Sequence, residues 1–466
     1  MRVPIILALS SSALCIGCYA RHGAEDAPRP RDSGAPRADA RSIPGPPDAG
    51  THDAGAVDFD AGAVDYDAGR VLPEEPEPPV EPGERPSERP PADEWTDPPD
   101  ADPDVCCDLD DPLEITPPGA QGSVPVVAWT GSGWSVLFQS HDPDGALPVA
   151  SEFVLYHALL DPDVTRVESF QPVPGRGASL VRAGEWAAGR HAVLATQWRN
   201  DTASFGLLDG AGTLTAWWAD VPAEGRDGAV ARQVLGATWA VVTRRDDRIE
   251  VRGFDSSTTE TALHTIDDVA EGGPVGAEGL DSRVAVAWIA DGQLRLQSVV
   301  VGEGLVDAPM ELGPVSLGTD SSLATAAFRD QVAITHLDGR RAWLTLADPF
   351  ERTHQRVDLG EARVGDREVG VVGVTKFGML GTCIPVGPGP WGGSTMASDE
   401  GVAFQLVSAD GTLLGERVTI VDDLRNVGGC AVAFHRDSFI VLWWRASGDR
   451  VYNSLWARRV RPRLPF

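Results

Sequence analysis

Beyond residue 112, short apolar stretches alternate with turn residues along the chain. Runs of Val, Ala, Leu and Trp are separated by Gly, Asp and Pro, and no long amphipathic helical pattern interrupts them. This pattern predicts many short strands joined by tight turns. In AWTGSGWSVLF, residues 128–138, two apolar arms flank a glycine turn. We therefore expect an all-β domain over residues 113–466.

The second arm of that hairpin recurs along the chain. Aligned on this strand, seven copies appear: GWSVLFQS at Gly133, RHAVLATQW at Arg190, TWAVVTRR at Thr238, SRVAVAWI at Ser282, DQVAITHL at Asp330, FGMLGTCIPV at Phe377 and DSFIVLWW at Asp437. Their spacing of about 45 to 60 residues is near that of a four-stranded propeller blade. Several copies are followed by a turn and a third strand, for example DGQLRLQSV.

Closure into a ring explains why both faces of each small sheet are apolar. A single sheet cannot bury both faces, whereas blades stacked around an axis bury each against a neighbour. The strand before each copy is rich in Ala and Gly, as in SLATAAF and GCAVAF, which suits close approach at the axis. The sequence therefore predicts a seven-bladed β-propeller. Six tryptophans are expected as wedges between blades, with sugar stacking as the alternative role for any one of them: Trp129, Trp134, Trp198, Trp239, Trp288 and Trp443.

The two ends of the repeat array are expected to meet. The last copy ends at its third strand, YNSLWARRV, and so lacks an outer strand. We expect residues 112–118, PLEITPP, to supply it and close the ring. The array resembles the propeller-like repeats of secreted bacterial proteins, but it lacks a Trp-Asp dipeptide, a double glycine that recurs in every copy as in kelch repeats, and a sialidase-type Asp box. No functional residue can therefore be carried over from that resemblance.

The N-terminal quarter differs in composition. Residues 19–112 hold 18 of the 37 prolines and few large apolar side chains, which predicts a disordered acidic tether. DFDAG and DYDAG place two aspartates before a glycine, as calcium loops do, but a solvated acidic linker is the simpler interpretation. These Asp-Ala-Gly and Pro-Glu stretches resemble the tethers of bacterial surface lipoproteins, which hold a domain clear of the outer membrane.

Residues 1–18 have the features of a signal peptide. Arg2 precedes an apolar run and then ALCIGC, which ends at Cys18. This segment resembles a bacterial lipoprotein signal, and the resemblance implies lipidation of Cys18 and an exported protein held at the outer membrane or cell surface. Cys15 is an alternative acceptor, and an ordinary secretory signal is the other alternative.

Net charge limits the partners. The chain carries a formal charge of -30, and Lys376 is its only lysine, so an acidic surface would repel phosphate backbones. We therefore expect no nucleic-acid partner, and membrane contact only through the N-terminal lipid.

Four cysteines remain beyond the signal. In an exported chain an even set favours disulfides, and we expect a bridge between Cys383 and Cys430, which lie in adjacent repeats. Cys106 and Cys107 would pair with each other or with a partner chain. No histidine stands at zinc-ligand spacing from Cys106 and Cys107, and the two cysteine pairs lie far apart in the sequence, so no metal site is predicted.

The sequence contains no recognisable catalytic motif. The histidines form no HxH or HExxH pair, although His336 and His435 lie in strands near the inner hairpins and are candidates for the channel. The Asp-Gly pairs suit hairpin turns, with calcium binding as the alternative: Asp209, Asp291, Asp338 and Asp410.

One insertion stands out. Residues 383–401 form a Gly/Pro-rich segment in the sixth copy, and its candidate recognition residues are Trp391, Asp399 and Glu400. We expect a non-enzymatic binding or scaffolding module without a cofactor, whose partner is a protein or glycan at the cell envelope. One alternative is a carbohydrate-active hydrolase or lyase whose site assembles in the channel. Another is a structural subunit with a large apolar patch on one ring face.

Overall fold

The structure is a computed structural model in which the chain divides into Met1–Gly83 and Glu84–Phe466, and the described residues all lie in the second unit. Within the second unit it describes residues 107–463 except for 118–121, 142–152, 174–178, 188, 198–201, 224–227, 234–237, 268, 270–272, 317–322, 363–368, 375–376, 388–399, 425–426 and 447–452. The expected signal peptide, Cys18 and residues 19–106 of the expected tether lie outside the described residues. No described segment forms a helix long and apolar enough to cross a membrane.

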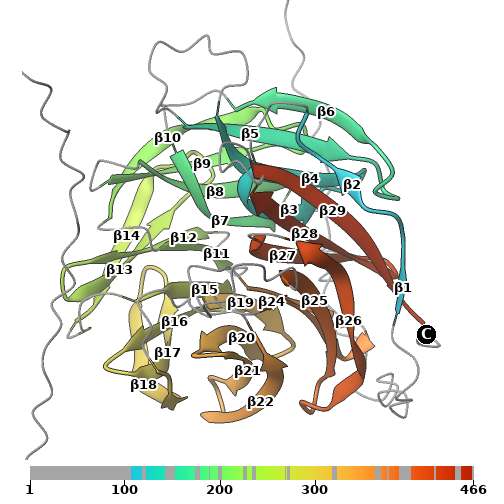
Figure 1. The fold of residues 1–466 in the computed structure, drawn as a ribbon. Coiled ribbons are helices and arrows are strands. Elements are labelled where there is room, and N and C mark those ends of the chain that lie inside the picture. Colours follow the sequence, from blue (N-terminus) through green and yellow to red (C-terminus); the bar gives the residue numbers. More distant parts are fainter. Residues whose placement is uncertain are drawn as a thin grey trace, which may run out of the picture. The chain divides into compact units, whose positions relative to one another are not determined.

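The described residues form seven antiparallel sheets, which confirms the predicted seven-bladed propeller (Figure 1). We number the blades 1 to 7 in chain order. Their first strands lie innermost, and each contacts the first strands of the two neighbouring blades. These inner strands are β3 (Ser123–Trp129), β7 (Ser179–Ala187), β11 (Gly228–Gln233), β15 (Val275–Gly279), β19 (Leu323–Phe328), β23 (Gly370–Val374) and β27 (Val427–His435).

The seven predicted copies are the second strands, each paired with the inner strand of its own blade. They are β4 (Trp134–His141), β8 (Arg190–Gln197), β12 (Thr238–Arg245), β16 (Val284–Ala290), β20 (Gln331–Asp338), β24 (Met379–Val386) and β28 (Ser438–Ala446). The third strands are β5 (Phe153–Leu160), β9 (Thr202–Leu208), β13 (Arg248–Phe254), β17 (Gln293–Val300), β21 (Arg341–Asp348), β25 (Glu400–Ser408) and β29 (Asn453–Pro462).

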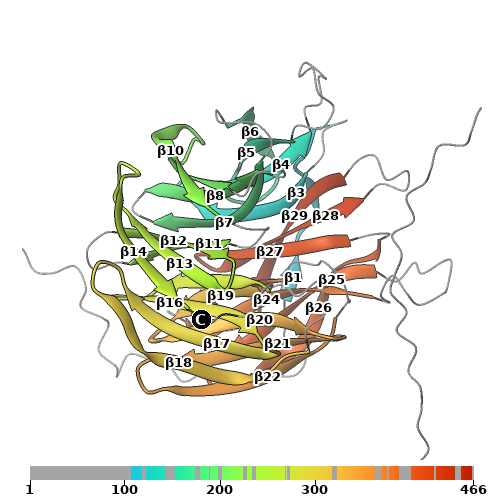
Figure 2. The same cartoon turned by 90° about the vertical axis from the view of Figure 1, so that its left-hand side faces the viewer.

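Outer strands complete the first six blades and lie at the periphery of the ring in Figure 1. They are β6 (Val167–Pro172), β10 (Leu214–Pro222), β14 (Glu260–Ile266), β18 (Gly304–Pro314), β22 (Thr353–Glu361) and β26 (Leu413–Leu424). Figure 2 shows the same blades after a quarter turn.

Blade 7 takes its outer strands from the N-terminal side of the domain, as expected. β2 (Leu113–Glu114) pairs with β29, where Leu113 is the partner of Ala457, and the backbone N–H of Ile115 donates to the carbonyl of Leu455 at 2.8 Å. β1 (Cys107–Leu109) also pairs with β29. β1 lies ahead of residue 113, where we expected the domain to begin, so the closing segment is longer than predicted.

The core consists of clusters at the seams between blades. Each described cluster combines residues of two adjacent blades; Trp288 of blade 4, for example, packs against Ala229 and Val242 of blade 3. Trp134, Trp239, Trp288 and Trp443 are at most 2% exposed and lie in four different seam clusters, as wedges between blades should. Trp198 lies outside the described residues.

Small residues allow the inner strands to approach one another. A Cβ atom on Gly279 would lie 1.9 Å from the carbonyl oxygen of Arg232 in the neighbouring blade, and one on Gly373 would lie 2.2 Å from that of Ala327. Any larger side chain at these two positions would push the strands apart. The predicted reason for the Ala and Gly content of the inner strands therefore holds.

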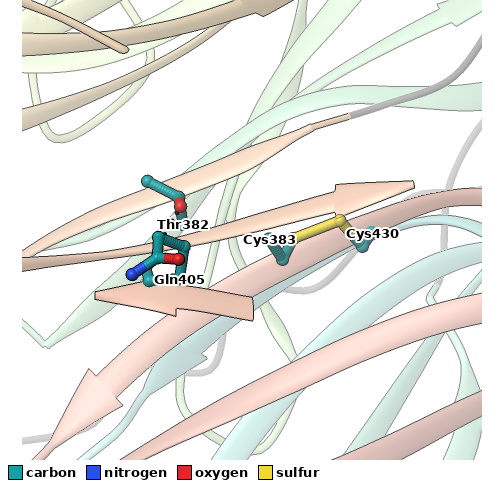
Figure 3. The surroundings of a disulfide bond; sticks show 4 residues. All are labelled: Thr382, Cys383, Gln405 and Cys430. Carbon is teal, nitrogen blue, oxygen red and sulfur yellow. Dashed lines mark hydrogen bonds between the residues drawn. A yellow bond between two sulfur atoms is a disulfide. The ribbon is translucent and has the colours of Figure 1, made fainter. Parts of the chain in front are cut away.

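A disulfide joins Cys383 of β24 to Cys430 of β27, across the seam between blades 6 and 7 (Figure 3). The predicted pairing is therefore confirmed. Both cysteines are buried, and beside them the Thr382 hydroxyl donates to the carbonyl of Gln405 at 3.1 Å. Cys107 lies in β1, and Cys106 lies outside the described residues, so the partner expected for that pair is not tested.

Candidate functional site

Partly exposed aromatic side chains gather on one face of the ring, at the turns between first and second strands. Trp129 ends β3 in blade 1, and His435 ends β27 in blade 7. Phe434 precedes His435 and faces the seam with blade 6, because successive side chains in a strand point to opposite sides. We call Trp129, Phe377, Phe434 and His435 the aromatic rim.

The rings of the aromatic rim contact one another across two seams. The indole of Trp129 stacks on the imidazole of His435, with centroids 3.6 Å apart and an interplanar angle of 11°. Phe377 meets Phe434 edge to face at 6.1 Å. All four side chains are partly exposed, whereas Trp134, which packs edge-on against Trp129 at 5.3 Å, is buried. The rim therefore offers aromatic surface on a rigid base.

Charged groups stand beside the rim. Arg436 and Asp437 form the exposed turn after His435, and Asp437 pairs with Arg459 at 3.5 Å. Arg459 also binds Asp163 of blade 1 at 2.6 Å, across the same seam. Burial, followed by the charge of Arg436, lowers the pKa of His435. The imidazole is therefore neutral near pH 7 and stacks on Trp129 without a charge.

Most of the predicted recognition loop, residues 388–399, lies outside the described residues. It connects β24 to β25, and β24 runs away from the face that carries Phe377. Trp391 and Asp399 lie outside the described residues. Glu400 begins β25, where its backbone is the partner of Leu424. Glu400 lies near the end of β24 and is not part of the aromatic rim. Sequence reasoning missed the rim because its rings come from different blades.

A second polar cluster lies inside the ring, at the seam between blades 1 and 2. The Ser135 hydroxyl lies 2.9 Å from Nε2 of His157 and 3.1 Å from Nδ1 of His191. A serine hydrogen-bonded to histidine is the arrangement that activates a nucleophile. Here, however, all three side chains are at most 1% exposed, so a substrate has no access to the hydroxyl.

Burial also governs the charge of this cluster. It lowers the pKa of His157 to about 4, against a weaker opposing effect of Asp209. For His191, burial and then the neighbouring His157 lower the pKa to about 3. Both rings are therefore neutral at pH 7. We assign the cluster to the packing of the two blades.

The other channel candidate, His336, is also buried at a seam. Its Nε2 lies 3.3 Å from Nη2 of Arg356, and Arg356 reaches the carbonyl of Pro314 in blade 4. Burial, then Arg356, lowers the pKa of His336 to about 4. His336 therefore joins the packing of blades 4 and 5.

The aspartates at the turns between third and fourth strands accept hydrogen bonds from backbone N–H groups of the same turn. Oδ1 of Asp209 accepts the N–H of Ala211 at 2.9 Å and of Thr213 at 2.8 Å, and Oδ1 of Asp255 accepts the N–H of Thr259 at 3.0 Å. Asp161 and Thr165 repeat this contact at 2.7 Å. A shared Asp-to-Thr spacing of four residues is the sequence signal that would have revealed these turns. Among the described residues, no group of three or more His, Cys, Asp or Glu is placed to hold a metal ion.

Comparisons with known proteins find the fold but no family. No protein-family model and no curated protein matches the chain. The Dos1 propeller is 9% identical over 76% of this chain and 95% of its own, with a TM-score of 0.45. The six-bladed fucose-recognising lectin of the fungus Aleuria aurantia is 10% identical over 67% of this chain and 99% of its own, with a TM-score of 0.41. Trypanosoma rangeli sialidase is 11% identical over 73% of this chain and 55% of its own, with a TM-score of 0.39. These likenesses concern the β-propeller fold alone.

Proposed function

We propose that the protein is a glycan-binding module of the cell envelope, held by a lipid on Cys18 and the acidic tether, with the aromatic rim as its binding surface. The observation that carries this proposal is the stacked pair of Trp129 and His435, which is partly exposed on a closed ring. Aromatic faces stack on the apolar faces of sugar rings, and rigid scaffolds concentrate binding groups at their turns.

Polar groups beside the rings support a saccharide over a purely apolar ligand. Arg436 and Asp437 are exposed next to the stack, and Arg459 holds Asp437 and Asp163 in place. Small-molecule sites combine an apolar surface with a few oriented polar groups, which a hydroxylated ring requires. The two chain segments that meet here, blades 7 and 1, are tied together by β1 and β2, so the surface is preorganised.

The test is binding of the purified protein to a printed array of neutral and acidic oligosaccharides, followed by titration of the strongest binder. Trp129→Ala should weaken that binding by about fivefold, because a stacking contact is worth roughly 1 kcal/mol. Trp129→Phe should retain most of it. Phe350→Ala is the matched control, since Phe350 is 44% exposed at a turn of blade 5 outside the rim. Loss in the control but not in Trp129→Ala, or an array without binders, would contradict the proposal.

The anchor is tested separately. Intact mass and membrane fractionation should show a diacyl or triacyl increment on Cys18 and detergent-dependent extraction. Both should disappear in Cys18→Ser. A soluble product cleaved elsewhere would remove the anchor from the proposal and leave the binding surface unaffected.

A further inference from the structure

The buried cluster between blades 1 and 2 links the two blades through one hydroxyl. Ser135 and His157 belong to neighbouring strands of blade 1, β4 and β5, and His191 belongs to β8 of blade 2. A hydroxyl donates one proton and accepts others, so Ser135 can donate to one neutral ring and accept from the other. The contacts of 2.9 and 3.1 Å fit this role.

His157 has no means of accommodating a second ring proton. Its Nδ1 is buried and has no hydrogen-bond partner. Gly212, in the turn after β9, packs directly against the ring: a Cβ atom there would lie 2.4 Å from Nδ1. An imidazolium carries N–H groups on both nitrogens, whichever tautomer the neutral ring has. Protonation would therefore bury an unpaired donor beside Gly212.

A neighbouring carboxylate and the rings themselves influence protonation in the cluster. Asp209, in the same turn as Gly212, is the charged side chain that favours protonation of His157. For His191 the interacting charge is that of His157 itself, so protonating one ring disfavours protonating the other. The carboxylate of Asp209 is already bound by the N–H groups of Ala211 and Thr213. The carboxylate that favours protonation of His157 is therefore already hydrogen-bonded to its own turn.

We propose that Ser135, His157 and His191 form an acid-sensitive clasp, which holds blades 1 and 2 together at neutral pH and releases this seam on acidification. The opened seam exposes the rings to water, where imidazole takes up a proton near pH 6.5, whereas in the closed seam His157 stays neutral down to about pH 4. The opened state therefore binds more protons between these values. Stability of the closed seam is complete above pH 6.5 and falls as the pH drops toward 4.

The experiment is hydrogen–deuterium exchange of the full chain at about pH 7 and about pH 4.5, corrected for the intrinsic pH dependence of exchange. We expect protection of β4, β5 and β8 to fall at least tenfold more than protection of β16 and β17 in blade 4. Equal changes in both regions, or no change in either, would overturn the proposal.

Two variants separate the clasp from general acid destabilisation. His157→Gln keeps a nitrogen at the Nε2 position but cannot titrate. It should reduce the excess exchange of β4, β5 and β8 at low pH at least threefold, because only His191 would then remain to take up a proton. His336→Gln removes a buried histidine at the seam between blades 4 and 5 and should leave that excess unchanged. The opposite result in either variant would contradict the clasp. If His157→Gln does not fold, the wild-type comparison of the two regions and the His336→Gln control still decide the outcome.

Discussion

Two seams of the same ring are held by different interactions. Between blades 7 and 1, Arg459 forms an ion pair with Asp163, Trp129 stacks on His435, and the N-terminal strands complete blade 7. Between blades 1 and 2, the polar contacts include the buried hydrogen-bonded cluster of Ser135 and two neutral histidines, and the side chain of Gln171 donates to the carbonyl of Ala211 at 2.6 Å. Guanidinium and carboxylate groups keep their charges across the physiological range, whereas imidazole titrates within it.

This difference shows that repeats of one blade can form seams that differ in their stability toward acid. Where the chain ends meet, pairing, charge and a neighbouring disulfide resist opening in several ways at once. One blade further on, a single hydroxyl and two rings depend on staying uncharged. We therefore expect reduction of the disulfide to weaken the seam between blades 6 and 7, and acid to weaken the seam between blades 1 and 2. Mutation of the N-terminal strands should weaken the seam between blades 7 and 1.

The largest expected effect comes from breaking the closure itself. Ile115 follows β2 and is 2% exposed in the core shared by blades 7 and 1. Ile115→Asp would bury an unpaired carboxylate there and should lower the free energy of unfolding by more than about 4 kcal/mol. Denaturant unfolding measures this, with Leu305→Asp as the control because Leu305 is 44% exposed. Equal losses in both variants would argue against the closure.

The next effect concerns the disulfide beside that seam. Replacing Cys383 and Cys430 by serine should cost about 2 to 4 kcal/mol under oxidising conditions, because the bridge restricts the unfolded chain. The wild type in reductant should approach the stability of the variant at pH 7. Wild-type thermal unfolding that is the same with and without reductant would mean that the bridge contributes nothing.

The smallest of these expected losses of stability concerns the seam between blades 1 and 2. Gly212→Ala adds a methyl group 2.4 Å from His157 in a residue whose φ is +78°, and we expect a loss of about 1 to 3 kcal/mol. Gly302→Ala is matched for backbone strain, since its φ is +95°, but nothing lies within 4 Å of its Cβ position. Thermal unfolding should show a larger loss for Gly212→Ala. A loss no larger than that of Gly302→Ala would mean that contact with His157 is unimportant.

Much of the fold was predictable because its signals are local. Each second strand is a short apolar run beside a turn. The small residues of β19 and β27 indicated that these strands lie close to the axis of the ring. The missing outer strand of blade 7 directed attention to residues 112–118. The bridge between Cys383 and Cys430 followed from their positions in adjacent repeats.

The candidate sites were less predictable because they arise from contacts between distant residues. Ser135, His157 and His191 each appear in the sequence as one polar residue in an apolar strand, and only the packing of two blades brings them together. Trp129 and His435 are separated by almost the whole ring in sequence. The insertion around Trp391 attracted attention through composition, a signal that does not show which face carries a binding surface.

The most direct test of the closed ring is the amide exchange of residues 107–116 at pH 7. In the closed ring, Ile115 donates to Leu455, and the N–H of Asp110 donates to Arg459 at 3.1 Å. The account predicts that these amides exchange as slowly as those of β27 and β28. Fast exchange of residues 107–116 while β27 and β28 remain protected would contradict it, because blade 7 would then lack its outer strand.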